Sequence, residues 1–353
     1  MNTFRQFELL LSHIPTVTTF YLSDVSEARG RQDLFIHQFP QKLKVLKEHA
    51  QIQSAISSNR IEGVTIAPTR IGTVMFGKPQ LIDRNEEEIS GYRKVLDQIH
   101  TRGYSLSLSE DLIRDFHRII RGNIWDAGQY KVEDGEIVEK LPNGHQRVRF
   151  KPVSAVEAPE YLRKLVVYWD KCLKENWVPP LIALAAFNLD FLCIHPFRDG
   201  NGRVSRLLLL LQSYHLGFEV GRYISLERII EENKERYYET LELSSQGWHE
   251  NQHDPWPFIN FILYILKIAY REFEQQMARL KNPKGAKTEL IETAIQSMTA
   301  EFSVSDLERA CPGVSRDMIR RVLRVFQKNR WVECLGRGPG AKWSKRGITL
   351  KKR

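Results

Sequence analysis

The stretch His195-Pro196-Phe197-Arg198-Asp199-Gly200-Asn201-Gly202-Arg203-Val204-Ser205-Arg206 carries the strongest signal in this chain. It leads into the apolar run 207–211, which is typical of a buried helix. The glycine-rich part is therefore expected to lie at the N-terminus of that helix, where free backbone N–H groups and the helix dipole favour an anion. Helical patterns on both sides of the stretch predict a mainly α-helical fold.

The titratable and charged residues of this stretch suit chemistry on a polyphosphate. His195 follows an apolar segment, and an imidazole that titrates near neutrality can take a proton from a hydroxyl group. Asp199 offers a hard oxygen ligand of the kind that Mg²⁺ binds alongside phosphates and water. Arg203 and Arg206 are three positions apart on the predicted helix, so their guanidinium groups share one face. These residues predict a site for a nucleoside triphosphate and a magnesium ion.

The uncharged residues of the loop favour the same conclusion. Gly200 and Gly202 have no side chains, which lets backbone N–H groups reach an anion, and Asn201 can donate a hydrogen bond to a phosphate oxygen. Taken singly, a histidine before proline is most often a helix-end residue, an Asp-Gly-Asn-Gly run is a turn, and an Arg-x-x-Arg pair is a solvated face. Their coincidence at one loop–helix junction favours the functional interpretation.

The composition is that of a globular protein. The chain has 353 residues, of which 42% are hydrophobic and 27% charged, enough for two or three domains with a substantial core. No run of about 18 apolar residues occurs, so we expect no transmembrane helix and no membrane partner. The first residues lack the basic and apolar regions of a secretory signal. The four cysteines lack metal-type spacing, which favours reduced thiols and a cytoplasmic location.

The net charge is concentrated at the C-terminal end. The whole chain has a formal charge of +9, and residues 281–353 contain 17 Lys and Arg but only 7 Asp and Glu. The rest of the chain is therefore close to neutral. This asymmetry predicts a separate C-terminal module with a polyanionic partner.

Periodicity and capping residues divide the chain into three predicted regions. We expect an N-terminal helical region over 1–100, a catalytic core over 101–280 and a further module over 285–353, with 281–285 as the linker. Glycines interrupt short alternating runs within 123–152, which favours a β-hairpin or flap. The predicted helices cover 41–61, 86–101, 110–121, 157–175, 181–193, 203–216, 232–245 and 255–280.

The sequence HPFRDGNGRVSR at 195–206 resembles the signature of the Fic family throughout its length, and the resemblance extends over about residues 40–280. It implies an α-helical bundle that carries a small β-hairpin flap. It also implies that the chain is a protein adenylyltransferase, which transfers AMP from ATP to a Ser, Thr or Tyr hydroxyl of a target protein. In the related Doc-type kinases a lysine stands at the position of Gly202, so the glycine favours AMP transfer over phosphate transfer.

The resemblance also implies roles for individual residues. His195 would deprotonate the target hydroxyl, Asp199 would hold Mg²⁺, and Arg203 and Arg206 would bind the β- and γ-phosphates. Phe197 would anchor the loop in the core. The nucleotide-binding residues implied in this way are Gly200, Asn201, Gly202, Arg203, Val204, Ser205, Arg206 and Tyr238, with Tyr238 assigned from its place in a helix that resembles the one beside the adenine pocket.

A second motif, Ser58-Asn59-Arg60-Ile61-Glu62-Gly63, resembles the inhibitory motif of the same family. By this resemblance helix 41–63 would be an inhibitory helix, and the Glu62 carboxylate would pair with Arg206 and block the productive pose of ATP. Ser58 and Gly63 complete the motif. The alternative is that Ser58 and Glu62 are ordinary surface residues near a helix end. The same glutamate also suits a reverse reaction, in which it positions a water molecule that removes AMP from modified targets.

Two further segments leave alternatives open. Residues 138–148 are the candidate for the flap that pairs with the target's backbone, although a simple surface loop fits equally well. Residues 285–353 are predicted to form a winged helix, with Ser303 and Ser315 as helix N-caps and the basic residues Arg316, Arg320, Arg321 and Arg324 away from the buried face. This module would bind DNA, or it would serve protein contacts such as homo-oligomer assembly. A DNA-binding regulator whose Fic core only senses nucleotide is therefore the rival function.

Overall fold

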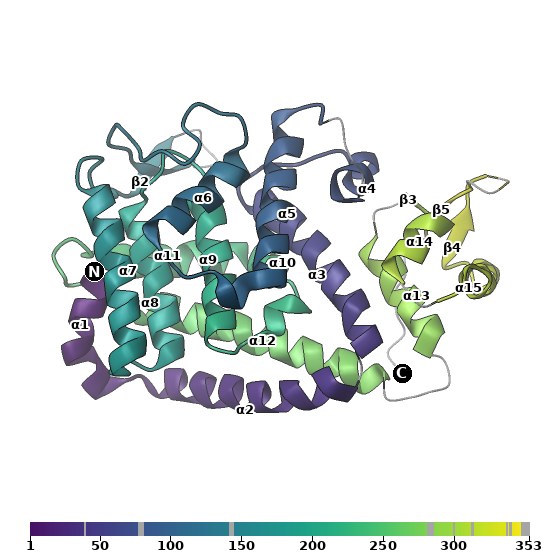
Figure 1. Ribbon diagram of the computed structural model, residues 1–353, viewed down its shortest axis with the longest axis horizontal. Helices are drawn as coiled ribbons and strands as arrows, with labels where there is room; N and C mark the ends of the chain where they lie inside the picture. The colour runs from purple at the N-terminus through teal and green to yellow at the C-terminus, as the bar shows by residue number, and fades with distance from the viewer. Residues whose placement is uncertain are drawn as a thin grey trace.

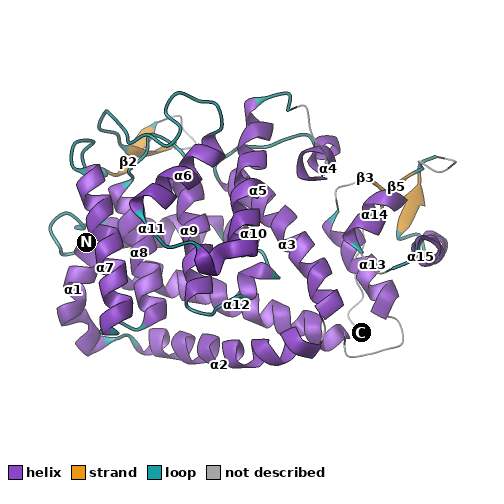
Figure 2. Cartoon of the chain, viewed as in Figure 1, coloured by secondary structure: helices purple, strands orange, loops and turns teal. Residues whose placement is uncertain are grey.

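The structure is a computed structural model, and it is built almost entirely from helices, with two small antiparallel sheets (Figure 2). Its buried hydrophobic residues form two clusters, a large one within residues 1–277 and a small one within residues 291–343. No helix in the described part of the chain is long and apolar enough to cross a membrane. The described residues are 1–38, 40–76, 81–140, 145–280, 286–298, 301–311, 314–336, 338 and 341–346.

The N-terminal region is helical, as the sequence predicts, and it wraps around the core. Helix α2 packs along α12, the last helix of the large cluster, and α3 packs against α5 and α10 (Figure 1). Helix α4 was not predicted. The elements are α1 (Asn2–Leu10), η1 (Leu11–His13), α2 (Thr16–Gln38), α3 (Pro40–Ile61) and α4 (Pro68–Phe76).

The core helices agree closely with the sequence prediction, and the first two of them begin at clear capping residues. The side chain of Asp83 accepts a hydrogen bond from Glu86 at the start of α5, and Ser109 caps α6 in the same way. The short helix α10 and the two short 3-10 helices η2 and η3 are the elements of this set that the sequence did not reveal. The elements are α5 (Arg84–Arg102), η2 (Gly103–Ser105), α6 (Glu110–Arg121), α7 (Ala158–Glu175), α8 (Pro180–Ile194), α9 (Asn201–His215), η3 (Val220–Arg222), α10 (Leu226–Glu232), α11 (Lys234–Ser245) and α12 (Trp256–Leu280).

Helix α8 lies at the centre of the bundle (Figure 1). Every residue from Leu181 to Ile194 is buried, in agreement with a helix that is apolar on all sides. Helix α8 contacts α1, α7, α9, α11 and α12. It therefore presents its C-terminal end, and the loop that follows it, from a rigid position in the core.

The predicted hairpin is present, and it lies over one side of the C-terminal end of α8. Strands β1 (Ile137–Lys140) and β2 (Gln146–Phe150) are antiparallel, with Val138 opposite Val148. Residues 141–144, which belong to the predicted flap segment 138–148, lie outside the described residues. Strand β2 contacts α11, so the hairpin leans against the helix that carries Tyr238.

The C-terminal unit is small and has its own hydrophobic cluster. The predicted N-caps are confirmed: Ser303 forms a capping box with Asp306, and Ser315 accepts a hydrogen bond from the Met318 N–H. Strand β3 was not predicted, and it joins the two expected strands in a sheet of order β3-β5-β4. The predicted linker 281–285 lies outside the described residues. The elements are α13 (Ala286–Ser297), β3 (Glu301–Ser303), α14 (Val304–Ala310), α15 (Arg316–Lys328), β4 (Val332–Cys334) and β5 (Lys342–Lys345).

Candidate active site

The loop between α8 and α9 is held rigidly by the core. His195 ends α8 in the left-handed conformation, with φ +50°, and Gly200 begins α9 with φ +85°. The Phe197 ring is fully buried and stacks on the His117 ring at 3.9 Å between centroids. Nε2 of His117 donates to the backbone oxygen of Asp199 at 2.9 Å. The prediction that Phe197 anchors the loop in the core is therefore confirmed.

The geometry around His195 prepares one ring nitrogen to act as a base. Nδ1 lies 3.3 Å from the backbone oxygen of Leu192. Because a carbonyl oxygen only accepts hydrogen bonds, Nδ1 carries the proton, and Nε2 is left as an acceptor. Burial, followed by the positive charge of Lys131, lowers the pKa of His195 to about 4. The imidazole is therefore neutral at neutral pH, as a general base must be.

Asp199 is held by cations and by the backbone. One carboxylate oxygen lies 2.5 Å from Nη1 of Arg121, and the other accepts from the Gly200 N–H at 2.6 Å and lies 3.5 Å from Nη2 of Arg203. Partial burial alone would raise the pKa of Asp199, but Arg203 and Arg121 hold it below its usual range. The side chain is 56% exposed, so an ionised oxygen ligand faces solvent at this point.

Arg203 is buried and paired. Its Nη1 contacts the Glu88 carboxylate from α5, and it lies 3.4 Å from the side-chain oxygen of Asn59 on α3. Glu88 also accepts from Arg121 at 2.8 Å. Glu88 therefore joins the two arginines that flank Asp199. The Nε of Arg203 is buried and has no hydrogen-bond partner among the described residues.

The segment 58–63, which is predicted to be an inhibitory motif, lies against Arg206. The Nε of Arg206 donates to the Ser58 hydroxyl at 2.8 Å, and its Nη2 donates to the Ser58 backbone oxygen at 2.9 Å and to Glu62 Oε1 at 2.8 Å. Although burial alone would lower it, the pKa of Arg206 is raised by the negative charge of Glu62. Gly63, with φ +80°, turns the chain away after the helix. Within the described residues, Nη1 of Arg206 is buried without a hydrogen-bond partner.

Gly202 provides the space that Glu62 occupies. A Cβ atom placed on Gly202 would lie 2.2 Å from Glu62 Oε1 and 3.2 Å from Nη1 of Arg206. The carboxylate thus occupies the position of a missing side chain at the start of α9. Any larger residue at position 202 would exclude Glu62 from its observed place.

A cavity of about 530 Å³ opens between these groups and the hairpin. Its lining includes His195, Glu62, Gly202, Tyr238 and Arg149, so the imidazole, the Glu62 carboxylate and the hairpin meet in one space. A groove of about 550 Å³ continues from it between the hairpin and α11. This volume is within the usual range for nucleotide-sized ligands.

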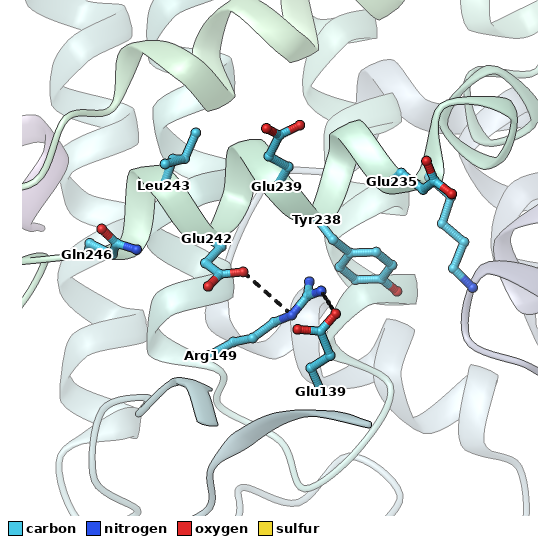
Figure 3. A pocket seen from close by; sticks show the side chains of 9 residues that line it. Glu139, Arg149, Glu235, Tyr238, Glu239, Glu242, Leu243 and Gln246 are labelled. Atoms are coloured by element: carbon cyan, nitrogen blue, oxygen red, sulfur yellow. Dashed lines mark hydrogen bonds and ion pairs between the residues drawn. The ribbon is translucent and has the colours of Figure 1, made fainter. Parts of the chain in front are cut away.

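Figure 3 shows how the hairpin is fastened beside Tyr238. The Arg149 side chain from β2 reaches between Glu139 of β1 and Glu242 of α11, and its guanidinium lies 5.6 Å from the centre of the Tyr238 ring. Arg147 pairs with the same two carboxylates. The neighbouring Tyr237 is buried and also lines the cavity.

Three predicted nucleotide-binding residues do not present their side chains to this cavity. The Asn201 side chain accepts from the Phe197 N–H at 3.0 Å and donates to the Phe197 oxygen at 2.7 Å, so it closes the loop instead of facing a ligand. Val204 is fully buried in the core, and its N–H donates to the Gly200 oxygen. Ser205 is buried and donates to Asn188 at 2.8 Å. The side chains of Val204 and Ser205 point away from the cavity because helical geometry places positions 204 and 205 on the inner face of α9.

Two residues of the site were missed by the sequence reasoning. Arg121 and Glu88 both have side chains less than 5% exposed, and both contact residues of the 195–206 stretch. Arg121 resembles an ordinary basic residue at a helix C-terminus, and Glu88 belongs to a run of three glutamates. No local pattern separates them from surface residues, so only the fold reveals them.

Residues 107–213, which include the His195 loop and the helices around it, match the Fic/DOC family. The protein adenylyltransferase Fic of Drosophila mojavensis is 26% identical over 248 residues, which cover 68% of this chain and 44% of that protein. The protein adenylyltransferase fic-1 of Caenorhabditis elegans is 27% identical over 215 residues, which cover 59% of this chain and 37% of that protein. The chain spans less than half of the length of these relatives.

Solved structures share the fold. A Fic family protein from Desulfovibrio desulfuricans G20 superposes with a TM-score of 0.62 and 22% identity, over 96% of this chain and 98% of that chain. Fic-1 from Caenorhabditis elegans superposes with a TM-score of 0.57 and 22% identity, over 75% of each chain. Family match, sequence relatives and shared fold agree on the helices that position His195, and residues 107–213 of the chain are similar to the Fic/DOC family.

Proposed function

We propose that the chain is a protein adenylyltransferase that transfers AMP from ATP to a Ser, Thr or Tyr hydroxyl of another protein, and that Glu62 inhibits it. The observation that carries the proposal is the arrangement around α9. A neutral histidine and two buried arginines with unpartnered N–H groups lie at one helix N-terminus, where an anion is favoured. The similarity to named adenylyltransferases supports this assignment.

In the proposed reaction the target oxygen attacks the α-phosphorus of ATP. The new bond joins the α-phosphorus to that oxygen, the bond from the α-phosphorus to the bridging oxygen breaks, and pyrophosphate leaves with the electron pair. Nε2 of His195 takes the hydroxyl proton. Backbone N–H groups at Gly200–Gly202 and the guanidinium groups of Arg203 and Arg206 hold the negative charge of the phosphates.

Asp199 is the residue that suits a magnesium ion. Its carboxylate is ionised and half exposed beside the proposed phosphate site, and magnesium usually takes one or two carboxylates and completes its shell with phosphates and water. Among the described residues no cluster of three or more His, Cys, Asp and Glu side chains forms a metal cage, so a shared protein–phosphate site is the expected type. The bound ion would neutralise charge on the phosphates.

The proposed inhibition follows from competition for Arg206. Glu62 Oε1 already occupies Nη2 of Arg206 at 2.8 Å, and a terminal phosphate needs the same guanidinium. Two anions at one cation repel each other, so ATP enters the productive pose only when Glu62 moves.

The test is incorporation of labelled AMP from ATP and Mg²⁺ into proteins of a cell lysate. Glu62→Gly is expected to raise incorporation at least tenfold over the wild type, and His195→Ala in that background is expected to abolish it. Arg60→Gly is the matched control. Arg60 lies in the last turn of α3, two residues before Glu62, but its side chain is exposed and pairs with Glu231. Equal labelling by Glu62→Gly with and without His195 would remove the imidazole from the mechanism.

We also propose a second function for the C-terminal unit, residues 285–353, as a winged helix that binds duplex DNA. A groove of about 660 Å³ lies between α15 and the β4–β5 hairpin, and Arg320, Arg324 and Trp343 line it. Both arginines are exposed on the face of α15 opposite its buried residues. A helix with a basic exposed face beside a basic hairpin matches the size and charge of a DNA groove.

A further inference from the structure

His195 lies between two cavities. One is the space that it shares with Glu62 and Tyr238, where the nucleotide is proposed to bind. The other, of about 340 Å³, is lined by Trp125, Lys131, Glu133, Glu136 and Phe197 among others, and shares with the first only His195 and Ile137. Because His195 lines both cavities, the second cavity offers a side from which a target segment could bring its hydroxyl to the imidazole.

We propose that this second cavity is a docking surface for a basic segment of the target protein, in which Lys or Arg residues flank the modified hydroxyl. The inference rests on the proposed AMP transfer and names the class of substrate for it. Three features of the cavity carry it: its exposed carboxylates, its internally paired cations and its exposed apolar side chains.

The carboxylates come from one short run that leads into the flap. Glu133, Asp134 and Glu136 are all exposed and immediately precede β1. One oxygen of Asp134 accepts from the Ala155 N–H at 2.6 Å. No ion pair within the described residues involves Glu133 or Glu136. Their charges are therefore available to a partner.

The two basic side chains that line the cavity already have partners within the protein. Arg198 donates to Asp126 at 2.7 Å and lies 5.0 Å from the centre of the Trp125 ring. Lys131 is buried beneath the cavity, and its Nζ lies 3.4 Å from the Ile194 backbone oxygen. The exposed and uncompensated charge of the cavity is consequently negative, which favours a positively charged partner and disfavours an acidic one.

The rim also carries exposed apolar surface, although Arg198 lies over part of the Trp125 ring. Trp125 is 70% exposed and Val132 is 77% exposed, and both line the cavity. A large exposed aromatic side chain beside carboxylates suits the stem and head of Lys or Arg, which pack on an aromatic ring while their charge meets the acid. The adjacent β1 strand begins at Ile137, so an extended target segment would run past the flap and the imidazole together.

The experiment measures binding of fluorescein-labelled nine-residue peptides to the full chain by fluorescence anisotropy. The peptides carry a central Ser, Thr or Tyr that is flanked on both sides by Arg, Gln or Glu. Arg-flanked peptides are expected to bind about tenfold more tightly than Glu-flanked ones at low salt, the effect of two exposed ion pairs, and less so at high salt. The double variant Glu133→Lys, Glu136→Lys is expected to reverse this order.

Matched controls place the same charge change elsewhere. Glu160→Lys and Glu175→Lys alter exposed glutamates on α7, and they are expected to leave the peptide order unchanged. The docking surface is overturned if the flanking charge has no effect on binding, or if the Glu133/Glu136 double variant keeps the wild-type order.

AMP transfer is scored separately with Glu62→Gly on the same peptides. Charge-dependent binding without any labelling would leave the docking surface in place and count against the proposed enzyme. Labelling that ignores the flanks, together with charge-independent binding, would count against the docking surface alone.

Discussion

Substitution of Gly202 by alanine tests the contact between Glu62 and Arg206 separately from the rest of the site. The added methyl group would lie 2.2 Å from Glu62 Oε1, where contacts below 3.0 Å are essentially never found. The carboxylate must therefore move by about 1 Å, the amount needed to restore a normal contact. That movement breaks its 2.8 Å hydrogen bond with Arg206.

The expected size of the effect follows from this one bond. Loss of a charged hydrogen bond to a buried guanidinium costs about 1–3 kcal/mol of unfolding free energy. Gly202 is also the second residue of α9, and alanine in a helix is favoured over glycine by up to about 1 kcal/mol. In a Glu62→Gly background the collision disappears, so the same alanine is expected to be neutral or stabilising.

The assay is a double-mutant cycle of the wild type, Gly202→Ala, Glu62→Gly and the double variant, measured by urea unfolding without nucleotide. We expect a coupling free energy of about 1–3 kcal/mol between positions 62 and 202, within the range for residues in contact. If Gly202→Ala changes the unfolding free energy equally with and without Glu62, the carboxylate does not occupy the space beside Gly202 and the explanation is wrong.

Two further predictions concern pH and DNA. Burial lowers the pKa of five histidines, to about 4 for His49, His117, His195 and His253 and to about 3 for His100. The unfolded chain binds these protons near pH 6.5, so the unfolding free energy should fall as the pH decreases from about 6.5 to 4, by up to about 1.4 kcal/mol per pH unit for each histidine. Urea unfolding at several pH values measures this change. An unfolding free energy that stays constant over this pH range would contradict the prediction. The double variant Arg320→Ala, Arg324→Ala should weaken binding of duplex DNA. It should also reduce the slope of log Kobs against log salt concentration by about 0.9 for each lost phosphate contact. An unchanged slope in a salt titration would argue against binding through the groove that these two arginines line.

Local sequence signals predicted the helix ends and the central loop well. Ser303 and Ser315 cap the helices that they were predicted to begin, and Asp83 and Ser109 cap α5 and α6 in the same way, because an N-cap hydrogen bond depends only on residues three positions apart. The pairing of Glu62 with Arg206 came from the resemblance to a known motif, since no local rule links positions 144 residues apart.

The parts that escaped prediction depend on distant contacts. Glu88 meets Arg121 and Arg203 across separations of 33 and 115 residues, so nothing in its own surroundings marks it as part of the site. Val204 was taken as nucleotide-binding because it belongs to the motif, whereas its position on the inner face of α9 places it in the core. Motif membership identifies a loop, but the packing of the bundle decides which side chains a ligand meets.

Arg206 is held both by Ser58, which belongs to α3, and by Glu62, which directly follows it. If Glu62 moves away, the two hydrogen bonds that Arg206 donates to Ser58 still orient its guanidinium group, so less conformational entropy is lost when that group meets a phosphate. Ser58 lies in the last turn of the 22-residue helix α3, and Glu62 immediately follows the end of that helix. Removal of α3 together with Glu62 is therefore expected to differ from a change of Glu62 alone, because the truncated chain would lose both the proposed inhibitory carboxylate and the Ser58 contacts that orient Arg206.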